Sequence, residues 1–208
     1  MAFDAGEVDF LTDLSVPYEH ELHRLARDGE RRDFKPCKTP ATYFFNFNCA
    51  SPEVAGRKNP FVDPRVRRAF TLATDRVSIV ENVRKRDDRV ARSFVPLDAI
   101  PGYQPPDGLP LDIPAAQRLL AEAGYNTGAD LGPVELLYPP RQAGVCQALA
   151  RMWEDSLGVQ VELRAQESKT FAEEKARQRF MIAWGNWYPD YNDPTTFLDC
   201  FATGNGNN

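Results

Sequence analysis

The sequence has few of the residues that build metal sites and nucleophilic active sites. Only two histidines and four cysteines occur in 208 residues. His20 and His23 stand three residues apart, as one helix face would place them, but no cysteine accompanies them as a third ligand. Without another histidine, a Ser-His-Asp or Cys-His arrangement is not expected. We therefore expect neither a metal nor a cofactor.

The cysteines are widely spaced and form no CxxC pair, which argues against a structural zinc site and a thioredoxin-type motif. We expect buried or unpaired thiols, with one disulfide as the alternative. The four are Cys37, Cys49, Cys146 and Cys200.

Long apolar runs and a basic charge balance are also missing. No stretch of about 18 apolar residues occurs, so a membrane-spanning helix is not expected. The formal net charge of −5 gives no positive field, and nucleic acid is not an expected partner. The arginines of 65–68 and Arg76 then indicate a solvated helix face. Residues 1–4 carry no basic-then-apolar leader, so we expect any secretory signal to lie outside this sequence.

The region 133–187 alternates between strand-like and helix-like patterns. Apolar runs alternate with stretches whose apolar residues recur at helical spacing. Strand, helix, strand, helix, strand is the pattern of a parallel sheet with right-handed crossovers. We therefore expect an α/β fold. The predicted elements are strand 133–138, helix 143–157 closed by Gly158, strand 159–163, helix 168–178 capped by Ser168, and strand 180–183.

The helix that opens at Asp63-Pro64 has the clearest pattern in the first half. Asp63 can accept hydrogen bonds from the free N–H groups of the first turn, and Pro64 loses nothing at that position. We expect one continuous apolar stripe from Val66 to Val83 that includes Val77. The other predicted elements are a helix 17–28 ended by Gly29, a strand 42–48, a loop 51–60, an irregular segment 96–110 and a helix 113–123 capped by Asp112 and ended by Gly124.

The stretch 180–198 has the pattern of a binding site. An apolar strand ends at a glycine and two tryptophans, passes through a Pro-punctuated turn with Asp190, and enters a helix at Asp193. Open α/β sheets bind ligands where a strand ends and the chain turns into a helix. Aromatic faces beside one carboxylate suit a cationic, partly apolar ligand.

Other interpretations of this stretch remain open. The tryptophans could belong to the core, and Asp190 could be an ordinary turn residue. Asp190 and Asp193 could form a catalytic carboxylate pair, but neither a nucleophile nor a metal set accompanies them in the sequence. Asp193 is most simply a helix N-cap.

Several segments, taken in order, resemble one family. They are 6–9 (GEVD), 42–48 (TYFFNFN), 63–69 (DPRVRRA), 73–76 (ATDR), 119–125 (LLAEAGY), 157–161 (LGVQV) and 187–198 (WYPDYNDPTTFL). The chain is thereby similar to the extracellular solute-binding proteins, family 5, the oligopeptide- and dipeptide-binding components of ABC importers. The resemblance implies one lobe of a type II periplasmic binding protein-like fold, with a mixed, mostly parallel sheet flanked by helices.

The resemblance also implies a function. Residues 1–208 would be a single ligand-binding lobe, the second of a longer two-lobed chain, closing with a sister lobe around a peptide-like, amine-bearing ligand. Such a protein is not an enzyme, is a monomer in the periplasm or at the cell surface, and delivers its ligand to a membrane permease. The alternatives are a sensor or regulatory module, and a binder of another small solute such as an oligosaccharide.

The site residues follow from the same resemblance. Asp190 would receive the ligand's ammonium group, and the stretch Gly185, Asn186 and Trp187 would lend backbone groups to an extended peptide. The basic residue that the family pattern has on the helix 168–178 is present here as Lys175. Trp184 departs from the pattern, because some oligopeptide binders have a basic residue there that meets the peptide carboxylate.

Overall fold

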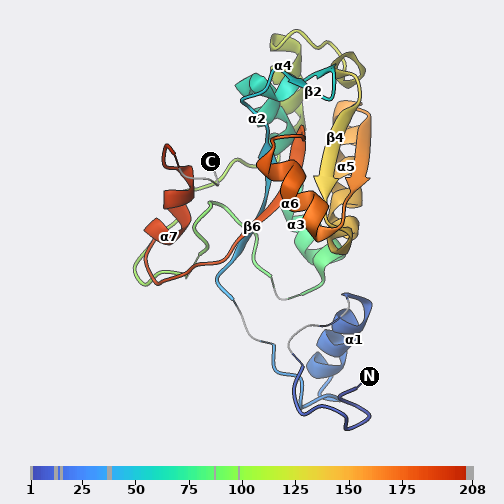
Figure 1. The fold of residues 1–208 in the computed structure, drawn as a ribbon, viewed down its shortest axis with the longest axis vertical. Helices are drawn as coiled ribbons and strands as arrows, with labels where there is room; N and C mark the ends of the chain where they lie inside the picture. Colours follow the sequence, from blue (N-terminus) through green and yellow to red (C-terminus); the bar gives the residue numbers. More distant parts are fainter. Residues whose placement is uncertain are drawn as a thin grey trace.

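The computed structural model shows an α/β protein built on one main sheet (Figure 1). It describes residues 2–11, 14, 16–36, 39–86, 88–97 and 99–204, and only the backbone of Val16 and Pro17. The expectation about Cys37 lies outside the described residues.

The main sheet has four strands in the order β1-β6-β4-β5. Strand β4 runs parallel to both β5 and β6, whereas β1 is antiparallel to β6, so the sheet is mixed as predicted. Helices α5 and α6 connect the three parallel strands in sequence. The bounds are Thr42–Phe47 for β1, Val134–Tyr138 for β4, Ala143–Leu157 for α5, Val161–Ala165 for β5, Ser168–Ala176 for α6 and Ile182–Trp187 for β6.

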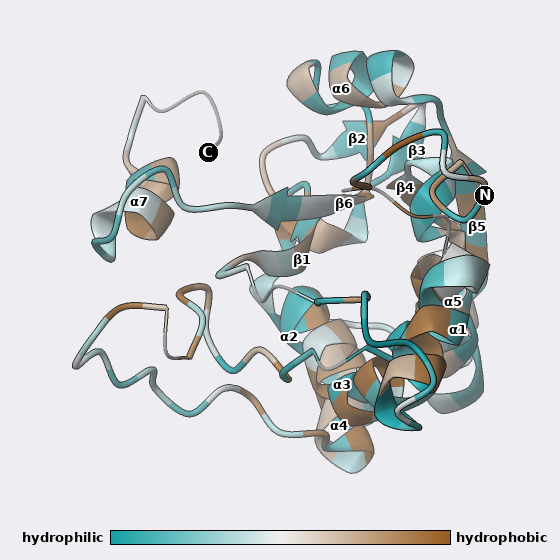
Figure 2. Cartoon of the chain, turned by 90° about the horizontal axis from the view of Figure 1, so that it is seen from below, coloured by the Kyte–Doolittle hydropathy of each residue, from teal (hydrophilic) through white to brown (hydrophobic). Residues whose placement is uncertain are grey.

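Helices cover both faces of the sheet, as Figure 2 shows for α6 on one side and α2, α4 and α5 on the other. Helix α2 spans Pro64–Leu72 and α4 spans Ile113–Glu122. The larger core lies on their side, where the buried Trp153 donates its indole N–H to the Phe70 carbonyl oxygen at 3.1 Å. A smaller cluster on the α6 side contains Leu137, Phe180 and Ala183.

The predicted single stripe from Val66 to Val83 is wrong. Helix α2 ends at Leu72, and a separate short helix, α3 (Arg76–Ser78), leads into a π-helical turn, Ile79–Arg84. Asp75 restarts the helix by accepting a hydrogen bond from the Ser78 amide at 3.0 Å. Val77 consequently points outward and is 51% exposed.

Other boundaries also differ from the prediction. Strand β6 starts at Ile182 and continues to Trp187, so both tryptophans lie within the strand. Strand β5 begins two residues later than expected, and Glu167, not Ser168, is the N-cap of α6. The expected loop 51–60 contains a small hairpin, β2 (Glu53–Val54) and β3 (Arg57–Lys58).

The ends of the described chain lie outside the main layers (Figure 1). Helix α1 (Val16–Arg27) lies beyond one end of the sheet, and α7 (Thr195–Leu198) lies to its side. An aromatic cluster holds α7, because Phe94 contacts Phe44 of β1, Phe197 and Phe201 with ring centroids 4.7 to 6.3 Å apart. No helix in the described part of the chain is long and apolar enough to cross a membrane. The 3₁₀ turns are Pro60–Val62, Gly128–Leu131, Pro140–Gln142 and Asp199–Phe201.

Candidate functional site

The second half of β6 has one unpaired edge. Strand β1 pairs with β6 along its whole length, from Phe47 opposite Ile182 to Thr42 opposite Trp187. On the other side, β4 pairs with β6 only at Ile182 and Ala183. Within the described structure, the backbone from Trp184 to Trp187 therefore has no strand beside it on that side. An extended ligand could add there as a further strand through backbone hydrogen bonds.

The turn after β6 is fixed by one buried threonine. Thr196 accepts a hydrogen bond from the Trp187 indole N–H at its carbonyl oxygen, 2.6 Å away. Its hydroxyl accepts another from the Asp190 amide at 2.9 Å. Asp193 caps the start of α7 by accepting from the Thr195 amide at 2.9 Å, as predicted. Thr196 thus holds both Trp187 and Asp190 against α7 and sets the shape of the turn.

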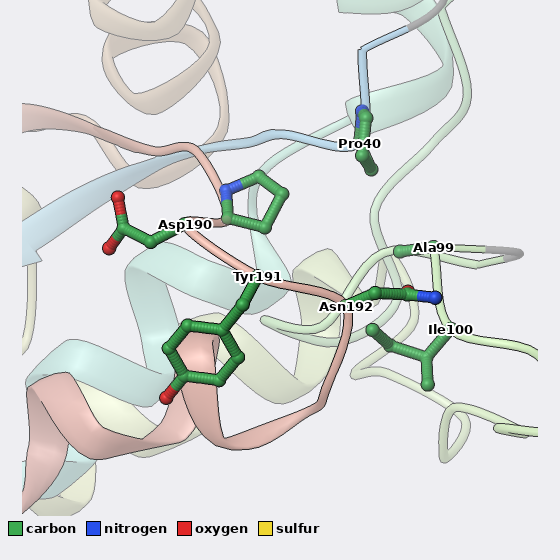
Figure 3. A pocket seen from close by; sticks show the side chains of 7 residues that line it. Pro40, Ala99, Ile100, Asp190, Tyr191 and Asn192 are labelled. Carbon is green, nitrogen blue, oxygen red and sulfur yellow. The ribbon is translucent and has the colours of Figure 1, made fainter.

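The Asp190 carboxylate is exposed at this turn. Among the described residues, no lysine or arginine forms an ion pair with it. A shallow pocket of about 290 Å³ lies behind the turn, lined by Pro40, Ala99 and Ile100 among others. Asp190 contributes to the lining of this pocket, but its carboxylate points away from Pro40, Ala99 and Ile100, as Figure 3 shows, and is available to an external cation.

Gly185 is required by packing within the sheet. A Cβ atom at this position would lie 2.6 Å from the Phe44 ring and 3.1 Å from the Asn46 side-chain nitrogen. Phe44 pairs with Gly185 across β1 and β6, so both face the same side of the sheet. The glycine thus lets the Phe44 ring lie close to the backbone of β6.

Trp184 and Trp187 face opposite sides of the sheet because they stand three residues apart on one strand. The Trp184 ring lies 5.7 Å from that of Tyr43 and 6.3 Å from that of Phe171 on α6. The Tyr43 hydroxyl lies 3.1 Å from the Tyr188 hydroxyl, which connects this aromatic group to the turn.

Lys175 lies on α6 beside the same aromatic group. Its ammonium nitrogen is 5.7 Å from the centroid of the Phe171 ring. Burial lowers the pKa of Lys175. In the described part of the chain no carboxylate pairs with it, since the neighbouring Glu174 forms ion pairs with Arg164 at 3.1 Å and with Arg179 at 3.7 Å.

The structure brings together most of the residues that the sequence pointed to. Gly185, Asn186 and Trp187 share the strand next to the Asp190 turn. Trp184 packs against the larger core and its ring also lies 6.3 Å from that of Phe171, beside which Lys175 lies on α6. Sequence reasoning missed Tyr43, Phe171 and Thr196. The first two reach the site through strand pairing and helix packing, which no local pattern reports, whereas Thr196 sits in the turn motif itself.

The histidines and the described cysteines lie outside this site. The His20 ring nitrogen is 2.7 Å from the Arg84 carbonyl oxygen, and His23 packs edge-on against Phe34. Cys49 is exposed and Cys146 and Cys200 are buried, and none of these three forms a disulfide. Burial raises the pKa of the Cys146 thiol to about 12. The described residues contain no group of three or more potential metal ligands.

The mixed sheet flanked by helices is that of a type II periplasmic binding protein-like lobe. The profile of the bacterial extracellular solute-binding proteins, family 5, middle region, matches residues 1–208, and the chain belongs to this family.

Individual relatives agree with this assignment. The chain is 33% identical to the periplasmic oligopeptide-binding protein OppA of Salmonella typhimurium over 222 residues, which cover 99% of this chain and 37% of that protein. It is 31% identical to the dipeptide-binding protein DppE of Bacillus subtilis, covering 99% of this chain and 37% of the relative. Haemophilus influenzae OppA in complex with the peptide RPPGFSPFR superposes with a TM-score of 0.80 at 26% identity, covering 100% of this chain and 40% of that one. The chain thus spans less than half the length of these relatives.

Proposed function

We propose that this chain is the ligand-capture lobe of a family 5 solute-binding protein that binds peptides for an ABC importer. In this proposal residues 1–208 form one lobe, and a sister lobe closes over the cleft. The protein works outside the cytoplasm, in the periplasm or at the cell surface, and passes its ligand to a membrane permease. The names of the relatives, periplasmic oligopeptide- and dipeptide-binding proteins, support the ligand class and the location.

One observation carries the assignment of the ligand site. An unpaired strand edge, Trp184 to Trp187, leads directly into a turn whose carboxylate has no partner in the described chain. We assign the edge to the ligand backbone and Asp190 to the ligand's α-ammonium. An ammonium held against a carboxylate in a closed, water-poor cleft is bound far more strongly than in water. Backbone pairing tolerates many side chains, so the same slot suits peptides of different sequence.

The same residues favour binding over catalysis. The Asp193 carboxylate already accepts hydrogen bonds from the amide and the hydroxyl of Thr195, at 2.9 and 2.7 Å. It therefore caps α7 and does not form a working acid–base pair with Asp190. We infer that the protein acts by capture and release of its ligand.

The test is calorimetry on the full-length gene product with Ala-Ala-Ala and its N-acetylated form. We expect Ala-Ala-Ala to bind, and we expect Asp190→Asn to lower the affinity by about ten- to a hundred-fold, because a charge-assisted contact is lost. Acetylation removes the ammonium and should weaken binding to the wild type by a similar factor while hardly affecting Asp190→Asn.

The matched control is Asp107→Asn, because Asp107 is fully exposed on the irregular segment far from the turn in sequence, with a side-chain exposure of 95%. It should leave the affinity unchanged. An Asp190→Asn protein that binds Ala-Ala-Ala like the wild type would refute the ammonium assignment. A wild type that binds neither this peptide nor longer ones would refute peptide capture itself.

A further inference from the structure

One aromatic side chain, Phe94, joins strand β1 to α7 and the 3₁₀ turn after it. The centroid of its ring lies 4.7 Å from that of Phe201 and 6.3 Å from that of Phe197, both edge-on. The same ring lies 4.8 Å from the Phe44 ring of β1. The Phe94 carbonyl oxygen accepts a hydrogen bond from the buried Thr42 hydroxyl at 2.8 Å. Phe94 therefore contacts α7 while it is itself fixed to β1.

Helix α7 needs tertiary contacts of this kind to keep its place. It is only four residues long, which is far below the length at which a helix is stable on its own. It also lies apart from the sheet layers (Figure 1, Figure 2). Phe197 is fully buried, yet neither Phe197 nor Phe94 belongs to one of the two core clusters. The Phe94 ring, which lies outside the main core, is thus part of what buries Phe197 and holds α7.

The position of α7 reaches the Asp190 turn through the residue next to Phe197. Thr196 accepts the hydrogen bond from the Asp190 amide at its hydroxyl, at 2.9 Å, and the one from the Trp187 indole at its carbonyl oxygen, at 2.6 Å. Behind the turn lies the pocket of about 290 Å³, so open space adjoins the turn on that side. A shift of α7 would therefore move Thr196 and, with it, the Asp190 backbone.

We propose that Phe94 is a positioning residue for ligand capture, which sets the place of the Asp190 carboxylate through α7 and Thr196. This proposal rests on the peptide-binding function proposed above. A charge-assisted hydrogen bond requires a separation of about 2.7–2.9 Å between its heavy atoms, so a displacement of the turn by about 1 Å removes most of its advantage. The Phe94 ring acts through α7 and not by contact with the ligand.

The first test needs no ligand. In Phe94→Ala of the full-length gene product, we expect the amides of residues 187–198 to exchange at least about ten-fold faster than in the wild type, because the hydrogen bonds at Thr196 open more often. The amides of β4 should keep their exchange rates, and Phe94→Tyr, which keeps the ring, should restore most of the protection. Hydrogen-exchange mass spectrometry of peptides that cover the two segments measures both. Unchanged exchange over 187–198 would overturn the proposal.

A milder variant covers the case in which Phe94→Ala does not fold. Phe201→Ala removes only one ring from the contact, and Phe201 is 55% exposed. Its exchange over residues 187–198 should rise in the same direction but by less, again without a change in β4. A Phe201→Ala protein with wild-type exchange over 187–198 would contradict the dependence of the turn on these rings.

The second test is calorimetry with Ala-Ala-Ala and its N-acetylated form. The ratio of the two affinities reports the contact between the ligand ammonium and Asp190. We expect Phe94→Ala to lower this ratio by at least about three-fold, Phe94→Tyr to restore most of it, and Phe94→Ala to add little to the effect of Asp190→Asn. A purely structural role would leave the ratio unchanged and would give additive effects with Asp190→Asn.

Leu97→Ala is the matched control, because Leu97 lies three residues further along the same segment and is 47% exposed. It should change neither the exchange of residues 187–198 nor the affinity ratio. An unchanged ratio in Phe94→Ala overturns the positioning role, while Ala-Ala-Ala binding and its dependence on Asp190 persist. A wild type that binds no peptide overturns the proposed function and with it the role in capture, whereas the exchange test reports separately whether Phe94 fixes the turn.

Discussion

Lys175 keeps a positive charge in a half-buried position, and burial lowers its pKa. Between its folded and unfolded pKa values, the folded chain binds fewer protons at this lysine than the unfolded chain does. The charged form therefore costs stability at neutral pH. This cost disappears as the pH rises through the folded pKa toward the unfolded value of about 10.4. A residue of this kind is more easily explained by binding than by folding.

Replacing this lysine should consequently stabilise the protein. We expect Lys175→Met to raise the free energy of unfolding at pH 7 by up to about 1 kcal/mol, with the gain shrinking as the pH approaches 10.5. Urea unfolding of the wild type and the variant at a series of pH values measures it. Lys169→Met, at an exposed position on the same helix, should show no such gain. A variant less stable than the wild type at pH 7 would show that the ammonium is stabilised by the chain itself.

At the scale of elements, two different packing arrangements meet on strand β6. One side of the strand must lie close under Phe44, while the edge toward β4 must stay open from Trp184 onward. Gly185 meets the first demand because it has no side chain to contact the ring. Any added carbon would have to displace a ring that is itself held by Phe94, at a centroid distance of 4.8 Å.

Gly185→Ala should therefore destabilise the protein by about 1–3 kcal/mol through overpacking. Adding Phe44→Ala should remove most of the extra penalty, and a double-mutant cycle of urea midpoints measures this coupling. Gly144→Ala is the control at a position with room for a side chain. Gly144 lies in helix α5, and the new methyl group would contact only the Val83 side chain, at 3.7 Å. That change should be neutral or stabilising by up to about 1 kcal/mol. Additive effects of Gly185→Ala and Phe44→Ala would contradict the steric explanation.

The order of the parallel unit could be predicted from the sequence because apolar periodicity and glycine stops are local signals. Helix α5 and its left-handed end at Gly158 occur as predicted. The break after Leu72 was missed because the stripe continues in the sequence, whereas Asp75 caps a new helix there. The end of β6 was missed because its pairing with β1 carries the strand on to Trp187, and pairing partners are not visible in one strand's sequence.

The candidate site likewise has one part that is visible in the sequence and one part that is not. Trp187 and Asp190 could be proposed from the sequence because strand, turn and helix start are consecutive in the chain. The ring contacts of Trp184 with Tyr43 and Phe171 join three distant segments, so they exist only after β1 pairs with β6 and α6 packs over them. Such contacts are tertiary, and a sequence read locally does not report them.

At the scale of the whole molecule, stability is distributed unevenly. The four strands and α2, α4 and α5 share one large core, whereas the described side chains of α1, residues 18–27, contribute to neither core cluster. Its described contacts with the body are mainly polar, such as the His20 ring with the Arg84 carbonyl and an ion pair between Glu19 and Arg86. Both contacts are partly buried, but they remove little apolar surface from water, which is the main source of folding stability.

Amide hydrogen exchange should reveal this difference. We expect the amides of α1 to exchange through local opening, well before those of β4, whose five residues are all buried. Mass spectrometry of peptides covering the two segments, with and without a low urea concentration, measures the two opening energies. The exchange of β4 should respond steeply to urea and that of α1 weakly. Equal protection of both segments would mean that α1 unfolds only with the core.

The half-open strand also bears on how such a protein can change over evolutionary time. The open edge of β6 is set by its pairing with β1 and β4, and in the proposed function it would pair with any ligand backbone, whereas discrimination would fall to partly buried side chains beside it. A substitution at an accessible position disturbs the core little. Under the proposed function, ligand preference would therefore change through a few side chains around a constant strand edge, while the fold stays the same.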